Sequence, residues 1–143
     1  MITSLEVLLV EDNPRDAEMT LRALKKGGID SGVLWVKDGE QALEYIAATG
    51  AFSGRAAGYP KVVLLDLKMP RVNGFEVLAR LKSSEETRTV PVVVLTSSGE
   101  HRDVLESHRL SANSYLVKPV SYDSFVDSVS RAGIYWTRSN QLP

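Results

Sequence analysis

Five short apolar runs constrain the fold of this chain more than any other feature of its sequence. They are Leu5–Val10, Val33–Val36, Val62–Leu65, Val92–Leu95 and Tyr115–Val117. Runs of Val and Leu without regular polar alternation are typical of strands that are covered on both faces, as in parallel sheets. A helical pattern follows each run, so strands and helices alternate five times along the chain. The sequence therefore predicts a doubly wound α/β domain with a five-stranded parallel sheet.

The first two helices have recognisable start signals. Asn13 can act as an N-cap, and Pro14 suits the first helical turn because its missing N–H costs nothing there. Asp38 and Gln41 have the spacing of a capping box, in which two side chains satisfy free backbone N–H groups. The second helix is predicted to run to about Thr49.

Composition limits the class of protein. The chain has 143 residues, 43% hydrophobic and 24% charged, which is typical of one folded domain spanning residues 1–143. A net charge of −1 gives no general attraction to nucleic acid or to an anionic membrane. Cysteine is absent, which excludes disulfides and thiolate metal sites. No run approaches the roughly 20 apolar residues that span a bilayer, and residues 1–4 run into the first predicted strand without the basic and apolar regions of a signal peptide. We expect a cytoplasmic domain without membrane or nucleic-acid partners.

Polar side chains follow four of the five predicted strands. They are Glu11, Asp12, Asp66, Thr96 and Lys118. In open α/β sheets, ligands bind outside the carboxyl ends of the strands. We therefore expect these five residues to contribute to one site.

This set of side chains is suited to phosphoryl transfer. Three carboxylates brought together repel one another unless a cation compensates them, and Mg²⁺ prefers oxygen ligands. Lys118 can pair with a carboxylate or with a phosphoryl oxygen, and Thr96 offers a hydroxyl beside it. An aspartate can act as the nucleophile and form an acyl phosphate.

The same strand ends resemble those of a known family. The segments LLVEDNP, LLDLKMPRVNG, VVVLTSS and ANSYLVKPV are similar to the strand ends and loops of two-component response-regulator receivers, in the same order. The resemblance covers nearly the whole chain. It implies a flavodoxin-like (βα)5 fold with strand order 2-1-3-4-5. It also implies a signalling protein that takes a phosphoryl group from a partner histidine kinase.

Carried over by position, the resemblance assigns roles to individual residues. It makes Asp66 the phosphoacceptor, and Thr96 and Lys118 the groups that contact the phosphoryl group. Tyr115 occupies the place of an aromatic side chain that changes rotamer on activation, although core packing is an equally good account of an aromatic residue there. The implied Mg²⁺ ligands are Glu11, Asp12, Asp66 and the backbone carbonyl of Lys68.

Three further segments resemble one subgroup. The long Gly50–Pro60 connection, the 85–90 segment and the chain's last residues are similar to single-domain receivers that accompany phytochrome-type histidine kinases. The resemblance thus suggests a phytochrome-type kinase as partner. Ser111 departs from the family, since relatives commonly have Gly at this helix end. If the position requires φ > 0, Ser carries a modest strain there.

The last predicted helix carries more apolar surface than one core face needs. Ile134, Tyr135 and Trp136 are consecutive, so they cannot all point inward from a helix. Trp136 can pack while the other two lie exposed, or the three can form a partner surface. We expect a homodimer built from the last two helices and the last strand, with the final residues extending the last helix.

Three functions remain to be distinguished. The first is the phosphorylation-controlled signalling module, which is not an enzyme and has no DNA-binding output domain, so that its output is protein–protein contact. The second is an aspartyl-phosphate phosphatase. Such an enzyme is expected to carry an acid two residues after the nucleophile, where this chain has Lys68. The third is a phosphorylation-independent adaptor, which loss of an acid or of the lysine would indicate. All of those residues are present.

Overall fold

One parallel sheet of five strands forms the centre of the molecule. The computed structural model describes residues 5–29, 32–55, 58–67, 69, 72–96, 101–118 and 122–140. The sheet order is β2-β1-β3-β4-β5, and every adjacent pair is parallel, which confirms the predicted topology. The strands are β1 (Val7–Val10), β2 (Val33–Val36), β3 (Val62–Leu65), β4 (Val92–Thr96) and β5 (Ser114–Val117).

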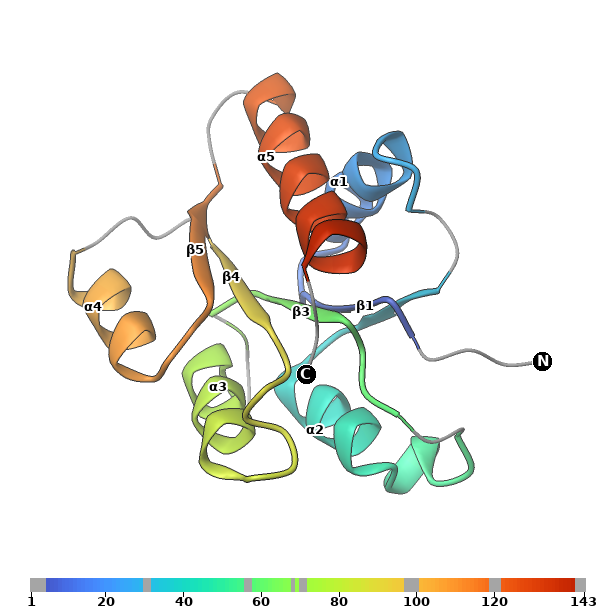
Figure 1. Cartoon of the computed structure of the whole chain (residues 1–143), viewed down its shortest axis with the longest axis vertical. Helices are drawn as coiled ribbons and strands as arrows, with labels where there is room; N and C mark the ends of the chain where they lie inside the picture. The colour runs from blue at the N-terminus through green and yellow to red at the C-terminus, as the bar shows by residue number, and fades with distance from the viewer. Residues whose placement is uncertain are drawn as a thin grey trace.

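Helices cover both faces of this sheet. The α-helices are α1 (Pro14–Lys26), α2 (Gly39–Ala47), α3 (Gly74–Ser83), α4 (His101–Arg109) and α5 (Tyr122–Ile134). In Figure 1, α1 and α5 lie side by side above the sheet, whereas α2 and α3 lie below it. Successive strand residues point to opposite faces of the sheet. Because the strands are continuous apolar runs, both faces are apolar, and each face forms its own hydrophobic core with the helices that cover it. Leu8 and Val10 of β1 belong to the lower core, and Val7 and Leu9 to the upper one.

The starts of α1 and α2 confirm the capping signals. The Asn13 Oδ1 atom accepts hydrogen bonds from the N–H groups of Arg15 and Asp16, at 2.9 and 3.2 Å. Asp38 accepts the Gln41 N–H at 2.8 Å. The Gln41 side chain accepts the N–H of Lys37, one residue before the cap. Two backbone N–H groups are thus satisfied, as in a capping box. The second is that of Lys37, whereas a standard capping box uses the N–H of the cap residue itself, here Asp38.

The long connection after α2 has a structural function that its composition does not reveal. It begins with a short 3₁₀ turn, η1 (Gly50–Phe52). Arg55 then donates hydrogen bonds to the carbonyls of Tyr45, Ile46 and Gly58, at 2.6, 3.1 and 2.9 Å. Its guanidinium also lies 4.4 Å from the centre of the Tyr45 ring. Arg55 therefore satisfies the last carbonyls of α2 and ties the loop to the helix.

The C-terminal segment continues α5 as a π-helical turn, η2 (Tyr135–Ser139), and residues 141–143 lie outside the described ranges. Ile134 and Tyr135 are 39% and 51% exposed, whereas Trp136 packs against the upper core. Arg138 forms an ion pair with Glu6 at 3.4 Å, which ties the turn to the residue preceding β1. Within the described ranges, none of the helices combines the length and the hydrophobicity that crossing a membrane requires.

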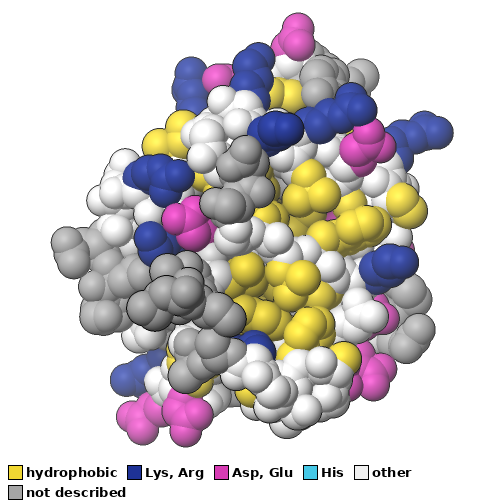
Figure 2. Space-filling view, turned by 90° about the vertical axis from the view of Figure 1, so that its right-hand side faces the viewer, with side chains coloured by type: hydrophobic (Ala, Val, Ile, Leu, Met, Phe, Trp, Pro, Cys, Tyr) yellow, Lys and Arg dark blue, Asp and Glu magenta, His cyan; other side chains and the backbone are white. Residues whose placement is uncertain are grey.

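The edge of the sheet at β2 is covered less than its centre. Val33, Leu34 and Trp35 are half-buried, whereas β1 and β3 are fully buried. Figure 2 looks onto the right-hand side of Figure 1 and shows apolar side chains gathered on this face. A groove at this edge is lined by Leu21, Lys25, Ile29 and Val33, so it is apolar with one charged side chain.

Candidate functional site

Three carboxylates meet at the carboxyl end of the sheet. Glu11 and Asp12 directly follow β1, and Asp66 directly follows β3. The two strands pair in register, with Val10 opposite Leu65, so their ends reach the same rim. One carboxylate oxygen from each acid lies within 4.8 Å of the others. Glu11 and Asp66 are buried and Asp12 is exposed, so the cluster is open to solvent on one side.

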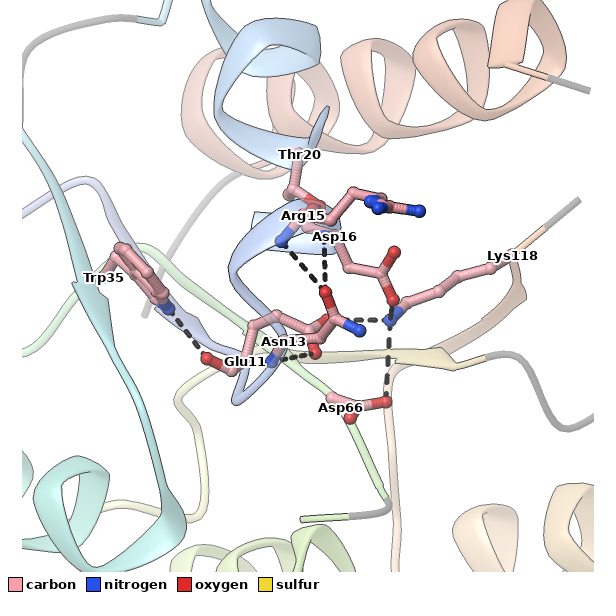
Figure 3. A network of polar contacts seen from close by, with 8 residues as sticks. All are labelled: Glu11, Asn13, Arg15, Asp16, Thr20, Trp35, Asp66 and Lys118. Atoms are coloured by element: carbon pink, nitrogen blue, oxygen red, sulfur yellow. Dashed lines mark hydrogen bonds and ion pairs between the residues drawn. The ribbon is translucent and has the colours of Figure 1, made fainter. Parts of the chain in front are cut away.

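Lys118 follows β5 and reaches into this cluster. Its Nζ atom lies 2.7 Å from Glu11 Oε1 and 3.8 Å from Asp66 Oδ1. A fourth carboxylate, that of Asp16, lies 2.9 Å from the same ammonium. The Lys118 side chain is only 10% exposed, so these contacts are screened less than surface ion pairs. Figure 3 shows the carboxylates of Glu11, Asp16 and Asp66 around the Lys118 ammonium.

Burial and charge shift the pKa values of these groups. Burial raises the pKa of Glu11 to about 7, and the hydrogen bond from Lys118 opposes this only in part. Burial likewise raises the pKa of Asp66 against the opposing charge of Lys118. Burial lowers the pKa of Lys118, but Glu11, Asp16 and Asp66 outweigh it and the net shift is upward. One ammonium is therefore too little positive charge to keep all of these carboxylates ionised at neutral pH.

The backbone around Glu11 is held from two directions. The Glu11 Oε2 atom accepts the N–H of Asn13 at 3.2 Å. The indole N–H of Trp35, on β2, donates to the Glu11 carbonyl at 2.7 Å. The Trp35 side chain is thus hydrogen-bonded to the backbone of a site residue, a contact that the sequence pattern did not indicate (Figure 3).

Gly74 allows α3 to begin close to Asp66. A Cβ atom at this position would collide with the Asp66 carbonyl oxygen and with the Cα atom of Leu67. The Gly74 N–H also donates to the Leu67 carbonyl at 2.9 Å. Only glycine permits so close an approach of two backbones. Gly74 is therefore a structural part of the site, although the sequence indicates only a turn.

The donor set of the cluster fits a hard divalent cation. The ligand atoms of Glu11, Asp12 and Asp66 are all carboxylate oxygens, the type that Mg²⁺ and Mn²⁺ bind in proteins. Asp12 is exposed, which leaves solvent access for water ligands or for phosphate oxygens. The arrangement can hold a cation at a cluster whose buried aspartate, Asp66, also lies 3.8 Å from an ammonium group.

The remaining predicted residues are less completely described. Lys68, whose backbone carbonyl is a predicted ligand, lies outside the described residues. Thr96 is the last residue of β4, next to β5 in the sheet, and its side chain is likewise outside the description. Tyr115 lies on β5, half-buried and packed against the lower core.

Comparisons with known proteins agree with this geometry. A family model for the response regulator receiver domain matches residues 7–130, a range that includes every site residue discussed above. The probable methanogenesis regulatory protein FilR2 of Methanothrix harundinacea is 39% identical over 137 residues, covering 96% of this chain and 86% of that protein.

Two solved structures are similar over almost their whole length. The phosphorylated cyanobacterial phytochrome response regulator RcpA superposes with a TM-score of 0.89 at 32% identity, covering 99% of both chains. The Mn²⁺-bound form of the response regulator Rcp1, a protein known from Synechocystis, has a TM-score of 0.87 at 32% identity. That match covers 97% of this chain and 99% of Rcp1.

Proposed function

The chain belongs to the response regulator receiver family, whose members are signalling phosphoacceptors rather than true enzymes, and we propose that Asp66 is its phosphoacceptor. The observation that carries this proposal is the position of Asp66. Its side chain lies within 4.8 Å of the other two acids and 3.8 Å from the Lys118 ammonium. Glu11 is already paired directly with Lys118 and Asp12 is exposed, whereas Asp66 is buried beside both acids and is not in direct hydrogen-bond contact with the ammonium, at 3.8 Å.

The proposed reaction is phosphoryl transfer from a phosphohistidine of a partner kinase. An Asp66 carboxylate oxygen attacks phosphorus, the P–O bond forms, and the P–N bond breaks with its electron pair left on the imidazole. Lys118 then pairs with a phosphoryl oxygen. Glu11, Asp12, Asp66 and the carbonyl of Lys68 would hold Mg²⁺. When bound, it supplies positive charge shared by the carboxylates and the phosphoryl oxygens.

Two further roles belong to this proposal. Thr96 donates a hydrogen bond to the phosphoryl group, and Tyr115 changes rotamer in response. The adjacency of β4 and β5 supports this, because Thr96 pairs with Val117 only two residues from Tyr115. Replacing Tyr115 by Leu tests the second role. A loss of phosphorylation-dependent output with unchanged stability supports a switch, and a loss of stability alone supports core packing.

Labelling with a small phosphodonor and Mg²⁺ tests the acceptor assignment. We expect Asp66→Asn to abolish the acid-stable, base-labile label that is expected of an acyl phosphate. Asp127→Asn, which removes an exposed carboxylate on α5, serves as the control and should be labelled like the parent protein. Equal labelling of the Asp66→Asn protein would refute the assignment.

We propose a histidine kinase of the phytochrome type as the partner, in the cytoplasm, with output through protein–protein contacts. The similarity to the phytochrome response regulator RcpA supports this. FilR2, which is also similar, is named as a probable methanogenesis regulatory protein, so a kinase unrelated to phytochromes is the alternative partner. Phosphotransfer profiling against phytochrome-type and unrelated kinases decides between them. Transfer from a phytochrome-type kinase that is no faster than from unrelated kinases would contradict this partner.

We also propose a homodimer through α4, β5 and α5. A groove of about 340 Å³ on this face is lined by Ser114, Leu116, Ser128, Arg131, Ala132, Tyr135 and Trp136. Tyr135 is 51% exposed at its rim, and Val117 on β5 is 46% exposed. Light scattering after size exclusion should show a dimer that Tyr135→Asp weakens and that Tyr59→Asp, at an exposed tyrosine outside the interface, leaves intact. Monomer alone at tens of micromolar, with and without an acyl-phosphate mimic, would exclude the dimer.

A further inference from the structure

We propose that Asp16 is a positioning residue for Lys118: it gives the ammonium a carboxylate partner outside the proposed metal-ligand set. This inference rests on the proposed function of the site. Asp16 lies in the first turn of α1, where an acid ordinarily only interacts with the helix dipole. Here its Oδ2 atom is 2.9 Å from Lys118 Nζ, a contact between residues 102 positions apart in the chain.

The contacts of Lys118 show why such a partner matters. The ammonium has three carboxylates around it, at 2.7 Å (Glu11), 2.9 Å (Asp16) and 3.8 Å (Asp66). Two of these, Glu11 and Asp66, belong to the group of acids that can hold a metal ion, and Asp16 does not. In Figure 3 the Asp16 and Asp66 carboxylates lie on opposite sides of the ammonium.

Glu11 therefore serves two cations. Its buried carboxylate is paired with Lys118 and is also one of the three acids proposed to bind Mg²⁺. Without Asp16, both remaining partners of Lys118 would be metal ligands, and ammonium and metal would compete for the same two carboxylates. With Asp16 present, Lys118 keeps one close partner that the metal does not use. Asp16 thus lowers the cost of metal binding and keeps the ammonium next to Asp66.

A second explanation has to be separated from this one. Any additional negative charge near the cluster attracts a cation, whether or not it acts through Lys118. The two explanations differ in one respect. A positioning role depends on the presence of the Lys118 ammonium, whereas a general electrostatic effect persists without it.

Calorimetric titration with Mg²⁺ measures the first effect. We expect Asp16→Asn to raise the dissociation constant for Mg²⁺ by about three- to tenfold. Asp16→Glu should restore at least part of the affinity because it keeps a carboxylate that can reach the ammonium. Glu18→Gln removes an exposed acid of the same helix that pairs with the exposed Arg22, and it should leave the affinity unchanged. An unchanged affinity in Asp16→Asn overturns the inference.

A double-mutant cycle identifies the route of the effect. In a Lys118→Met background, or in Lys118→Gln if the Met variant does not fold, Asp16→Asn should change the Mg²⁺ affinity by less than about twofold. The same loss of affinity as in the parent background overturns the positioning role, because the charge then acts without the lysine. Circular dichroism of each variant establishes that the fold is intact.

The labelling experiment separates this inference from the proposed function. If the parent protein is labelled on Asp66 and Asp16→Asn binds Mg²⁺ as the parent does, only the role of Asp16 fails. If the Asp66→Asn protein is labelled as fully as the parent, the proposed function fails, and the role of Asp16 falls with it.

Discussion

At the scale of single residues, Glu11 has the most conflicting environment in the described site. It is 1% exposed, it is charged at high pH, and Asp66 lies beside it. A folded-state pKa of about 7, above the ordinary glutamate value of 4.5, means that folding favours the protonated acid. This stabilising contribution is complete below about pH 4.5 and is lost as the pH rises through 7.

We therefore predict that, without divalent cations, the free energy of unfolding falls between pH 5 and pH 8 by on the order of 1–3 kcal/mol. The upward shift of the Asp66 pKa acts in the same direction. Urea denaturation over a pH series in the presence of a chelator measures this. The Glu11→Gln variant, which keeps the shape but not the charge, should show a flatter dependence. The same slope in both proteins would contradict the prediction.

Ser111 supplies a second prediction at this scale. Its φ of 69° lies in the left-handed region, which confirms the expectation of a backbone position suited to glycine. Ser111→Gly should raise the free energy of unfolding by about 0.5–1 kcal/mol, because the strain is relieved at some cost in chain entropy. Ser128→Gly, within α5, should instead lower it by about 0.5 kcal/mol, because glycine favours a helix less than serine does. Chemical denaturation of both variants tests the contrast, and a loss of stability in Ser111→Gly would contradict it.

Several residues of the site were not predictable from the sequence for a physical reason. Asp16 has the pattern of an ordinary acid in a first helical turn, and nothing in local spacing shows that Lys118 lies beside it. Trp35 is part of an apolar run, so its hydrogen bond to the Glu11 carbonyl depends on the pairing of β2 with β1. Contacts of this kind arise from tertiary packing, whereas residues at strand ends are visible as a local pattern.

At the scale of elements, the apolar runs identified all five strands, because strands buried on both faces leave an unambiguous pattern. The strand order was available only from the family resemblance, since the runs themselves do not state which strands are neighbours. The predicted end of α2 was less accurate. The helix ends at Ala47 rather than near Thr49, because Ala48 adopts a left-handed conformation with φ of 56°.

The cap provided by Arg55 gives the prediction at this scale. Arg55→Ala leaves the carbonyls of Tyr45 and Ile46 without these donors and removes the contact with the Tyr45 ring. We expect a loss of about 1–2 kcal/mol in the free energy of unfolding and faster hydrogen exchange in α2. Arg22→Ala breaks only an exposed ion pair and should cost less than about 0.5 kcal/mol. Equal effects of the two variants would contradict a capping role.

At the scale of the whole molecule, one sheet has two functions: its strands supply apolar residues to the cores, and the ends of the same strands place acids close together. Apolar residues of β1 and β3 fill both cores, whereas the residues that directly follow these strands are acids. Repulsion between these acids destabilises the fold, and the burial of apolar residues in the two cores offsets it. Removing one of these charges should stabilise the protein without metal and weaken the site.

This trade-off can be measured through metal binding. A ligand that binds only the folded state adds RT ln(1 + [L]/Kd) to stability, about 2.7 kcal/mol at a hundredfold excess over Kd. We predict that Mg²⁺ or Mn²⁺ raises the melting temperature of the parent protein in a concentration-dependent way. Asp66→Asn should melt at a higher temperature than the parent in chelator, because a buried charge is gone, yet gain less from added metal. Asp127→Asn, whose acid is exposed on α5, should follow the parent in both conditions. An equal gain from metal in Asp66→Asn and in the parent would mean that Asp66 is not among the ligands. The repulsion between the acids that follow β1 and β3 would then have no connection with metal binding.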